Sequence, residues 1–326
     1  MSFQNQVNAN QAPAKVGDRA SMNSVQVVDA GPGNLTAGTG GVTVGRFAWN
    51  TYVSGAGTAL NNASGVPVVP DGFIANEQQA LITVYLGETS LVVPAGLGVT
   101  EYDRGDFWAK STYSEAVIGN KVFANVFSGE CLAAATGAFP TNDSGSATSV
   151  TATGTVGTYS INISAIAAGV VAVGQKISGT YIAAETYIES QADSSTGSTG
   201  NYNLSRPLLG SFTSGTLALV SPEGNGGGVV SASANTGSPT LTINSVTTGH
   251  VYAGMLVSGT SIPSGTYISA LGTFTNAAGT GTVTLSANTT GTISSASIKT
   301  SSWIETPWTV KSAANVGELM KIGIKN

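Results

Sequence analysis

The chain has 326 residues, a formal net charge of −5, and charged side chains at only 9% of its positions, whereas ordinary soluble proteins carry roughly 25%. Catalysis and metal binding use His, Cys, Asp, Glu and Lys held in clusters, so we expect no catalytic residues, no metal site and no cofactor. The acidic balance argues against a nucleic-acid partner, because binding to a phosphate backbone needs clustered Lys and Arg.

Residues 1–20 show no apolar period of 2 or 3.6. They predict an extended N-terminal arm that is disordered alone and orders only against a partner. The segment lacks the basic and apolar regions of a secretion signal, and no run of about 18 apolar residues could span a bilayer. We therefore expect no membrane partner.

From residue 21 to residue 143, short runs of β-branched and aromatic residues alternate with Gly-rich turns, which is typical of an all-β domain. The predicted strands lie at 25–28, at 42–49, within 79–93 as a pair broken near Gly87, and across 107–127. Aromatic and charged residues return after Thr300. We expect residues 301–326 to close this domain, with a final strand that returns to its first sheet.

The block between these two segments has a different composition, because only seven charged residues occur from 144 to 300. It contains an internal duplication at an offset of 80 residues. Residues 161–190 align without gaps on residues 241–270, and 11 of the 30 positions are identical. The similarity resumes after a one-residue shift, where GNYNLS (200–205) matches GTVTLS (281–286).

Each copy alternates β-branched runs with Gly-centred turns, so each predicts a small antiparallel β module. We name them repeat 1 (144–221) and repeat 2 (229–300), with a flexible hinge in PEGNGGG between them. The predicted fold is therefore all-β: an extended arm, a discontinuous β-barrel or sandwich domain (21–143 with 301–326), and an inserted pair of duplicated antiparallel β modules.

Several segments outside the duplicated block occur in the order of a known family. They are AGPGNLTAGTGGVTVGRFAW (30–49), GFIANEQQALITVYLGETSLVVPAGLGVT (72–100), GDFWAK (105–110), GNKVFANVFSG (119–129), AATGAFP (134–140) and PWTVKSAANVGELMKI (307–322). They lie within residues 21–143 and 301–326, which together are about half of the chain, and the chain resembles the tailed-bacteriophage capsid decoration proteins, often called structural cement proteins. Members of that family usually lack a duplicated block, which here resembles Ser/Thr/Gly-rich modules of phage structural proteins.

The resemblance implies a non-enzymatic protein that binds the outer face of an icosahedral phage capsid. Its partners would be the major capsid protein and two further copies of itself, in a trimer at threefold or quasi-threefold positions. It would be made and assembled in the host cytoplasm and would end on the outer surface of the virion. We expect the inserted repeats to be a solvent-facing protrusion that adds contacts around the trimer or touches host surface glycans.

The arm and the segment EYDRGDFWAK (101–110) are the expected contacts with the coat. The second segment is the densest charge cluster of the chain, and we place it in a hairpin turn, where a salt-bridged loop is the structural alternative. The candidate capsid-contact residues are Gln4, Gln6, Gln11, Lys15, Asp18, Arg19, Glu101, Asp103, Arg104 and Asp106.

Single reactive residues are interpreted structurally. We expect Cys131 to be a small buried hydrophobe and His250 to lie on the surface or in a turn. Trp49 and Trp108 are expected in the core. For Trp303 and Trp308, a core position and an intersubunit or insert-to-domain junction remain open alternatives.

Two other functions are compatible with the sequence. The first is a receptor- or glycan-binding module of a phage fibre or adhesin, in which the duplicated block would carry the function. The second is a polysaccharide-degrading enzyme, which would need a cleft with two or three carboxylates. The block offers only Glu185, Glu189, Asp193 and Glu223 for that role.

Overall fold

The computed structural model describes residues 14–29, 34–53, 57–77, 91–111, 113–141, 148–166, 171, 176–183, 186–191, 199–204, 207–220, 227–249, 251–274 and 279–324. These residues form β-strands and turns, and no helix occurs among them. The all-β class predicted from the sequence is therefore confirmed. In this part of the chain there is accordingly no helix of the length and apolarity needed to cross a membrane.

The chain divides into two compact units. Unit 1 comprises residues 1–64, 68–138 and 304–326, and unit 2 comprises residues 65–67 and 139–303. Unit 1 is thus assembled from segments that lie far apart in the sequence, and it contains both the end of the N-terminal segment and the C-terminal strands.

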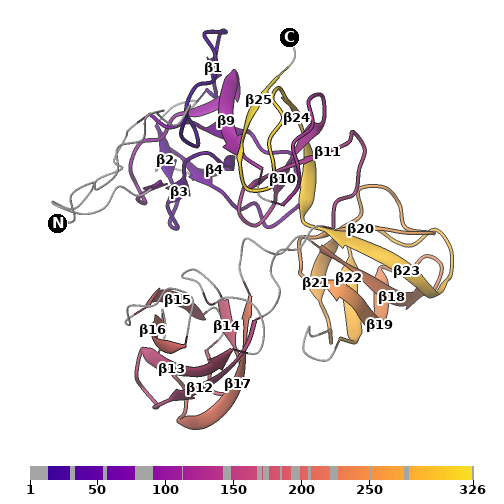
Figure 1. Cartoon of the computed structure of the whole chain (residues 1–326). Helices are drawn as coiled ribbons and strands as arrows, with labels where there is room; N and C mark the ends of the chain where they lie inside the picture. The colour runs from indigo at the N-terminus through magenta and orange to yellow at the C-terminus, as the bar shows by residue number, and fades with distance from the viewer. Residues whose placement is uncertain are drawn as a thin grey trace. The chain divides into compact units, whose positions relative to one another are not determined.

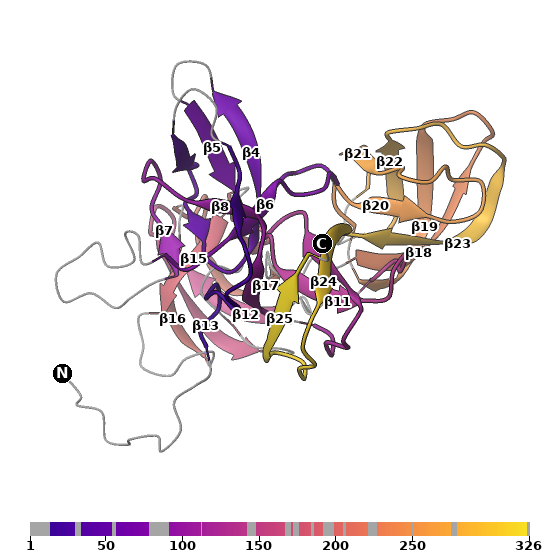
Figure 2. The ribbon, with the colours of Figure 1, turned by 90° about the horizontal axis from the view of Figure 1, so that it is seen from above.

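Unit 1 is built on two larger β-sheets and one small one (Figures 1 and 2). The first sheet has the order β1-β8-β6-β4-β5-β2, with strands Gln26–Val27, Glu101–Arg104, Gly72–Ile74, Phe47–Val53, Gly57–Asn61 and Leu35–Ala37. The second has the order β11-β10-β24-β25-β9, with strands Cys131–Ala134, Lys121–Asn125, Trp303–Val310, Leu319–Gly323 and Asp106–Lys110. The small sheet pairs β3 (Val42–Thr43) with β7 (Val92–Val93).

An aromatic cluster joins the two larger sheets. Phe47, Phe73 and Tyr102 come from the first sheet, Phe107 and Trp308 from the second, and all five are buried. Neighbouring ring centroids lie 5.0–6.0 Å apart in tilted or edge-to-face geometry, the arrangement that aromatic pairs prefer. Each such buried side chain contributes about 1.5–3 kcal/mol by leaving water, so this cluster dominates the core of unit 1.

Two sequence expectations for unit 1 need correction. The closing segment supplies two strands rather than one, and both join the second sheet instead of the first. The reason is that β25 pairs with β9, Met320 opposite Ala109, which places its alternate apolar residues in the core. Trp108 is only half-buried, whereas Trp49 is buried and donates its Nε1–H to the Val68 carbonyl at 2.8 Å. Of the strand pair expected within 79–93, residues 79–90 lie outside the described residues.

Repeat 1 is a closed six-stranded barrel in the order β12-β13-β16-β15-β14-β17 (Figure 1). Its strands are Thr148–Gly154, Ser160–Ile166, Gly200–Leu204, Thr186–Gln191, Lys176–Ser178 and Phe212–Val220. Repeat 2 has the order β20-β23-β18-β19-β22-β21, with strands Leu256–Ser258, Ile293–Ser301, Gly227–Ala234, Thr240–Gly249, Gly281–Leu285 and Ile268–Leu271. When each strand is matched to the one six positions earlier, the cyclic order is the same. An isolated bridge between Leu256 and Tyr267 lies where β20 and β21 would close the second barrel.

The strand register repeats as well as the order. Ala152 lies opposite Ile163 in repeat 1, and Ala232 lies opposite Ile243 in repeat 2, each next to a β-bulge at the preceding residue. A buried threonine closes a turn after β14 in repeat 1 and after β20 in repeat 2. Thr186 Oγ1 donates to the Ala183 carbonyl, and Thr266 Oγ1 donates to the Pro263 carbonyl, both at 2.7 Å. The offset of 80 residues seen in the sequence is therefore an offset between equivalent structural positions.

Candidate functional site

The segment Glu101–Lys110 forms a corner between two sheets and not the hairpin expected from the sequence. Strand β8 pairs with β1 and β6 in the first sheet, whereas β9 pairs with β25 in the second. Gly105 sits at the corner with φ +139°, and a Cβ there would lie 2.7 Å from the Phe107 ring and 2.8 Å from Val25 Cγ1. Because a Cβ at this position would overlap the Phe107 ring and Val25, the turn that connects the two packed sheets requires glycine.

The last residues of the predicted arm pack against this corner. The Gly17 N–H donates to the Trp108 carbonyl at 2.7 Å, the Trp108 N–H to the Asp18 carbonyl at 2.9 Å, and the Ala20 N–H to the Asp106 carbonyl at 2.8 Å. The expectation that the arm orders only against a partner is therefore wrong for residues 14–20. These residues complete the free edge of β9, which a sheet otherwise leaves exposed. Residues 1–13, with Gln4, Gln6 and Gln11, lie outside the described residues.

Asp106 anchors the segment that follows the arm. Its Oδ2 accepts hydrogen bonds from Ser21 Oγ at 2.6 Å and from Asn23 Nδ2 at 2.7 Å, and Lys321 Nζ lies 3.9 Å from the same atom. The side chain is buried. Asp106 thus ties the chain after the arm to the corner and to the C-terminal strand, and is not itself exposed for contact.

These segments surround a surface hollow of about 680 Å³. Its lining residues are Asn23, Ser24, Val25, Gln26, Arg104, Gly105, Asp106, Lys311 and Ile324. Arg104 is exposed, and the exposed Arg19 lies at the margin, where its guanidinium donates to the Asn23 carbonyl at 3.2 Å. Three basic side chains, those of Arg19, Arg104 and Lys311, therefore lie together at this surface of a chain whose net charge is negative. We call these three residues and the hollow the corner surface.

Glu101 was predicted as a contact residue, but its side chain is fully buried. It lies against Gly72, where an added Cβ would be 2.6 Å from Glu101 Cγ. Burial raises the pKa of Glu101 to about 8; Asp71 and Asp103 add to the rise, while the Asn50 side chain and the Gly72 backbone oppose it. Neither carboxyl oxygen of Glu101 has a hydrogen-bond partner of good geometry among the described residues, and the same holds for Asn50 Oδ1. Glu101 is consequently a neutral, internal acid near pH 7 and no part of the corner surface.

The remaining predicted contact residues differ in their surroundings. Asp18 is occupied within the chain, since Oδ2 accepts from the Lys15 N–H at 2.8 Å and Oδ1 from Asn76 Nδ2 at 2.9 Å. Asp103 is half-buried. Lys15 is exposed within the last part of the arm. Arg19 and Arg104 are therefore the two predicted residues that the structure brings to one exposed surface.

Sequence reasoning missed Lys311, Lys321 and Asn23 as neighbours of the corner. All three come from segments that were recognised. The proximity of Lys311 and Lys321 depends on the pairing of β25 with β9, and that of Asn23 on its hydrogen bond to Asp106. The one available signal was the recurrence of Lys residues in the closing segment at 311 and 321, which alone does not say what these residues face.

Reactive groups outside the corner surface were compared over the described part of the chain. Cys131 is buried, and this burial raises the pKa of its thiol, which suits a small core residue rather than a nucleophile. Over the described ranges, no group of three or more His, Cys, Asp or Glu side chains is placed to hold a metal ion. His250 lies outside these ranges, as do Glu185, Asp193 and Glu223. The side chain of Glu189 is likewise not described.

Comparison with known proteins gives one family match. The family model described as XM1 gp53 minor capsid protein matches residues 3–174, which is more than half of the chain. The match includes the corner, most of unit 1, and the strands β12 and β13 of repeat 1. Neither the curated proteins nor the solved structures contain a significant match.

Proposed function

The chain belongs to the XM1 gp53 minor capsid protein family and is a structural protein of a phage capsid; on this premise we propose that it is a decoration protein that binds the outer face of the shell. The observation that carries the proposal is the corner surface. A protein that holds coat subunits together needs a rigid, preformed contact surface. The corner surface is built on two packed sheets, and residues 14–20 are hydrogen-bonded along β9 beside it.

The contact with the coat is made through Arg19, Arg104 and Lys311. A basic surface on an otherwise acidic protein orients the molecule toward an acidic area of the coat subunit and opposes the reverse orientation. Residues 14–20 lie along β9, and residues 1–13 precede them in the sequence, outside the described part of the chain. The arm is proposed to contact the coat together with the corner surface.

The protein acts as a trimer at threefold or quasi-threefold positions. After one subunit binds, the other two face effective concentrations of order mM, so three weak contacts reach an avidity about 10² to 10⁴ times the affinity of one. A molecule that binds only the assembled lattice stabilises it by about 2.7 kcal/mol at a hundredfold excess over Kd. This function needs no catalytic group.

The repeats form a protrusion directed away from the coat. The two ends of the inserted block lie next to each other, since Ser301 Oγ donates to the Pro140 carbonyl at 2.5 Å. A module inserted in this way can be carried by a capsid-binding domain without interrupting its sheets. The alternative, a fibre or adhesin module that uses unit 1 only as a mount, places the attachment function in the repeats.

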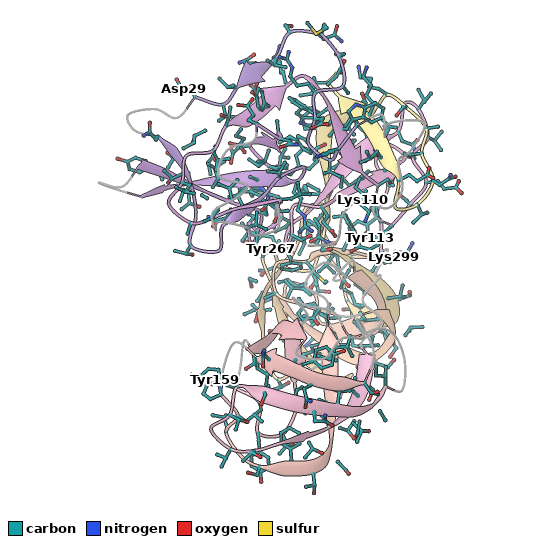
Figure 3. The ribbon with its side chains drawn as sticks, turned by 60° about the vertical axis from the view of Figure 1, so that its left-hand side comes forward. Asp29, Lys110, Tyr113, Tyr159, Tyr267 and Lys299 are labelled. Atoms are coloured by element: carbon teal, nitrogen blue, oxygen red, sulfur yellow. The ribbon has the colours of Figure 1, made fainter. Side chains whose placement is uncertain are left out.

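Charge reversal at the corner surface tests the contact. We expect the double variant Arg104→Glu, Lys311→Glu to bind purified capsids lacking this protein at least about tenfold more weakly in co-sedimentation, and wild-type binding to weaken with salt. Lys299→Glu is the control for a reversal at a distant exposed site, because Lys299 is exposed on repeat 2 and its substitution makes half the charge change of the double variant (Figure 3). Unchanged binding of the double variant would refute this contact surface.

Deletion of residues 146–300 tests the division of roles. Residues 141–145 would then connect Pro140 to Ser301, which already touch, so unit 1 should close. We expect the shortened chain to remain trimeric by sedimentation and to bind capsids as the full chain does. Loss of capsid binding with an intact fold would favour the fibre or adhesin alternative.

A further inference from the structure

One end of the repeat 1 barrel exposes four large apolar side chains. Val156, Tyr159, Tyr181 and Leu209 are 56%, 57%, 49% and 64% exposed, and Tyr159 projects from the barrel (Figure 3). We call these four residues the repeat 1 tip. Single exposed apolar residues are common, but a group of them on one surface marks a binding site.

Backbone hydrogen bonds hold the three loops of the tip together. The Gly157 N–H donates to the Leu208 carbonyl, the Leu208 N–H to the Thr158 carbonyl, and the Leu209 N–H to the Tyr181 carbonyl, each at 2.9 Å. The four side chains therefore arise from loops whose backbones are fixed against one another.

Repeat 2 has the same backbone and different side chains. There the Gly237 N–H donates to the Thr289 carbonyl, the Thr289 N–H to the Ser238 carbonyl, and the Thr290 N–H to the Ser261 carbonyl, at 2.8–3.0 Å. The residues at the positions of Val156, Tyr159, Tyr181 and Leu209 are Thr236, Pro239, Ser261 and Thr290. The fold of the module consequently does not require the apolar residues of repeat 1.

Tyr181 occupies a backbone position that disfavours it. Its φ is +65°, and the equivalent Ser261 has φ +64°, so this position is left-handed in both repeats. A bulky residue with positive φ is a genuine outlier, and residues with such backbone strain cluster at functional sites. The Tyr181 ring lies over Gly210, where an added Cβ would overlap it. One face of the ring is thus supported, and the side chain remains half exposed.

The loops of the tip are rich in hydroxyl groups, and they carry one acidic and one basic residue, Glu185 and Arg206, outside the described part of the chain. No residue within 155–160, 178–183 or 207–213 is charged, and Thr155, Thr158, Ser160 and Ser211 lie in these loops. Four half-exposed side chains offer on the order of a few hundred Å², less than the roughly 500 Å² per partner (about 1,000 Å² in total) that a stable protein interface needs. Aromatic rings with hydroxyl groups around them match a sugar, which has apolar C–H faces and a rim of hydroxyls.

We infer that the repeat 1 tip binds a neutral carbohydrate, with the Tyr181 ring as the stacking platform and Tyr159 beside it. This inference rests on the proposed function only for the outward direction of the repeats. Sugar binding itself can be measured on the isolated full chain, so the two proposals fail separately.

Tyr181→Ser is the decisive variant, because it installs the residue that repeat 2 carries and relieves the left-handed tyrosine. Loss of binding in this variant would therefore not come from misfolding. Ser261→Ala, at the equivalent position of repeat 2, is the matched control. The full-length protein and both variants are tested on an array of neutral and acidic bacterial oligosaccharides, and hits are titrated by saturation-transfer NMR.

We expect wild type and Ser261→Ala to bind neutral oligosaccharides, and Tyr181→Ser to bind them at least about tenfold more weakly. Three results would overturn the inference: no neutral oligosaccharide bound by wild type, equal binding by Tyr181→Ser, or preference for acidic sugars. If Tyr181→Ser instead abolishes self-association in sedimentation or binding to capsids, the tip contacts a second copy or the coat, and the carbohydrate assignment is wrong. Sugar binding by a protein with no affinity for capsids would leave this inference standing and remove the proposed function.

Discussion

The buried carboxyl of Glu101 makes the stability of unit 1 depend on pH. The folded-state pKa of about 8 exceeds the ordinary value of 4.5, so the folded chain holds this proton more tightly than the unfolded chain. The stabilisation is fully present below pH 4.5 and is lost as pH rises through 8. At about 1.4 kcal/mol for each pKa unit, the loss reaches at most about 5 kcal/mol.

Glu101→Gln replaces the protonated acid with a neutral group of the same shape. We expect wild type to lose unfolding free energy between pH 5 and pH 9, and the variant to lose far less. At pH 9 the variant should unfold up to about 10–20 °C higher than wild type, while at pH 5 the two should be alike. Glu115→Gln changes an exposed carboxyl of the same unit and serves as the control.

Thermal unfolding followed by tryptophan fluorescence measures this directly, because Trp49 and Trp308 are both buried in unit 1. A wild-type unfolding temperature that is constant from pH 5 to pH 9 would refute the reasoning. So would a Glu101→Gln variant that is less stable than wild type at pH 9, since that result would mean that the charged carboxylate is stabilised by a group near it.

Four further substitutions test the packing described above. Asp106→Ala should cost about 1–3 kcal/mol by leaving its donors unpaired, and hydrogen exchange should show residues 21–23 losing protection; unchanged protection would mean that Asp106 does not anchor them. Trp308→Ala should lower the unfolding free energy of unit 1 by about 3–5 kcal/mol, measured by urea titration, and a cost below 1 kcal/mol would contradict its central place in the aromatic cluster. Thr186→Val and Thr266→Val should each cost about 1 kcal/mol in the repeat that carries them, and strongly unequal costs in calorimetry would argue against the equivalence of the two turns.

The strand-forming pattern and the duplication could be predicted because they depend on local signals. Runs such as Phe47–Val53 combine β-branched and aromatic residues, and the offset of 80 residues recurs as Ala152 opposite Ile163 and Ala232 opposite Ile243. The equal cyclic strand order of the two repeats follows from equal patterns of turns and apolar residues. Pattern and periodicity therefore sufficed for the fold class.

The pairing of distant strands could not be predicted in the same way. EYDRGDFWAK has the local signature of a hairpin, two short strands around a glycine, and only the partners of β8 and β9 reveal a corner. Because Glu101 looks like any surface carboxylate in the sequence, its burial depends on its position over Gly72. Residues 14–20 carry no periodic signal, since backbone groups alone tie them to β9.

We propose that three copies of this chain bind the outer face of a capsid through their corner surfaces. Electron cryo-microscopy of capsids reconstituted with the purified protein tests this proposal most directly. We expect three copies around threefold or quasi-threefold positions, with Arg19, Arg104 and Lys311 against the coat and the repeats pointing outward. Density for the repeats against the coat, or protein bound on the inner face, would contradict it.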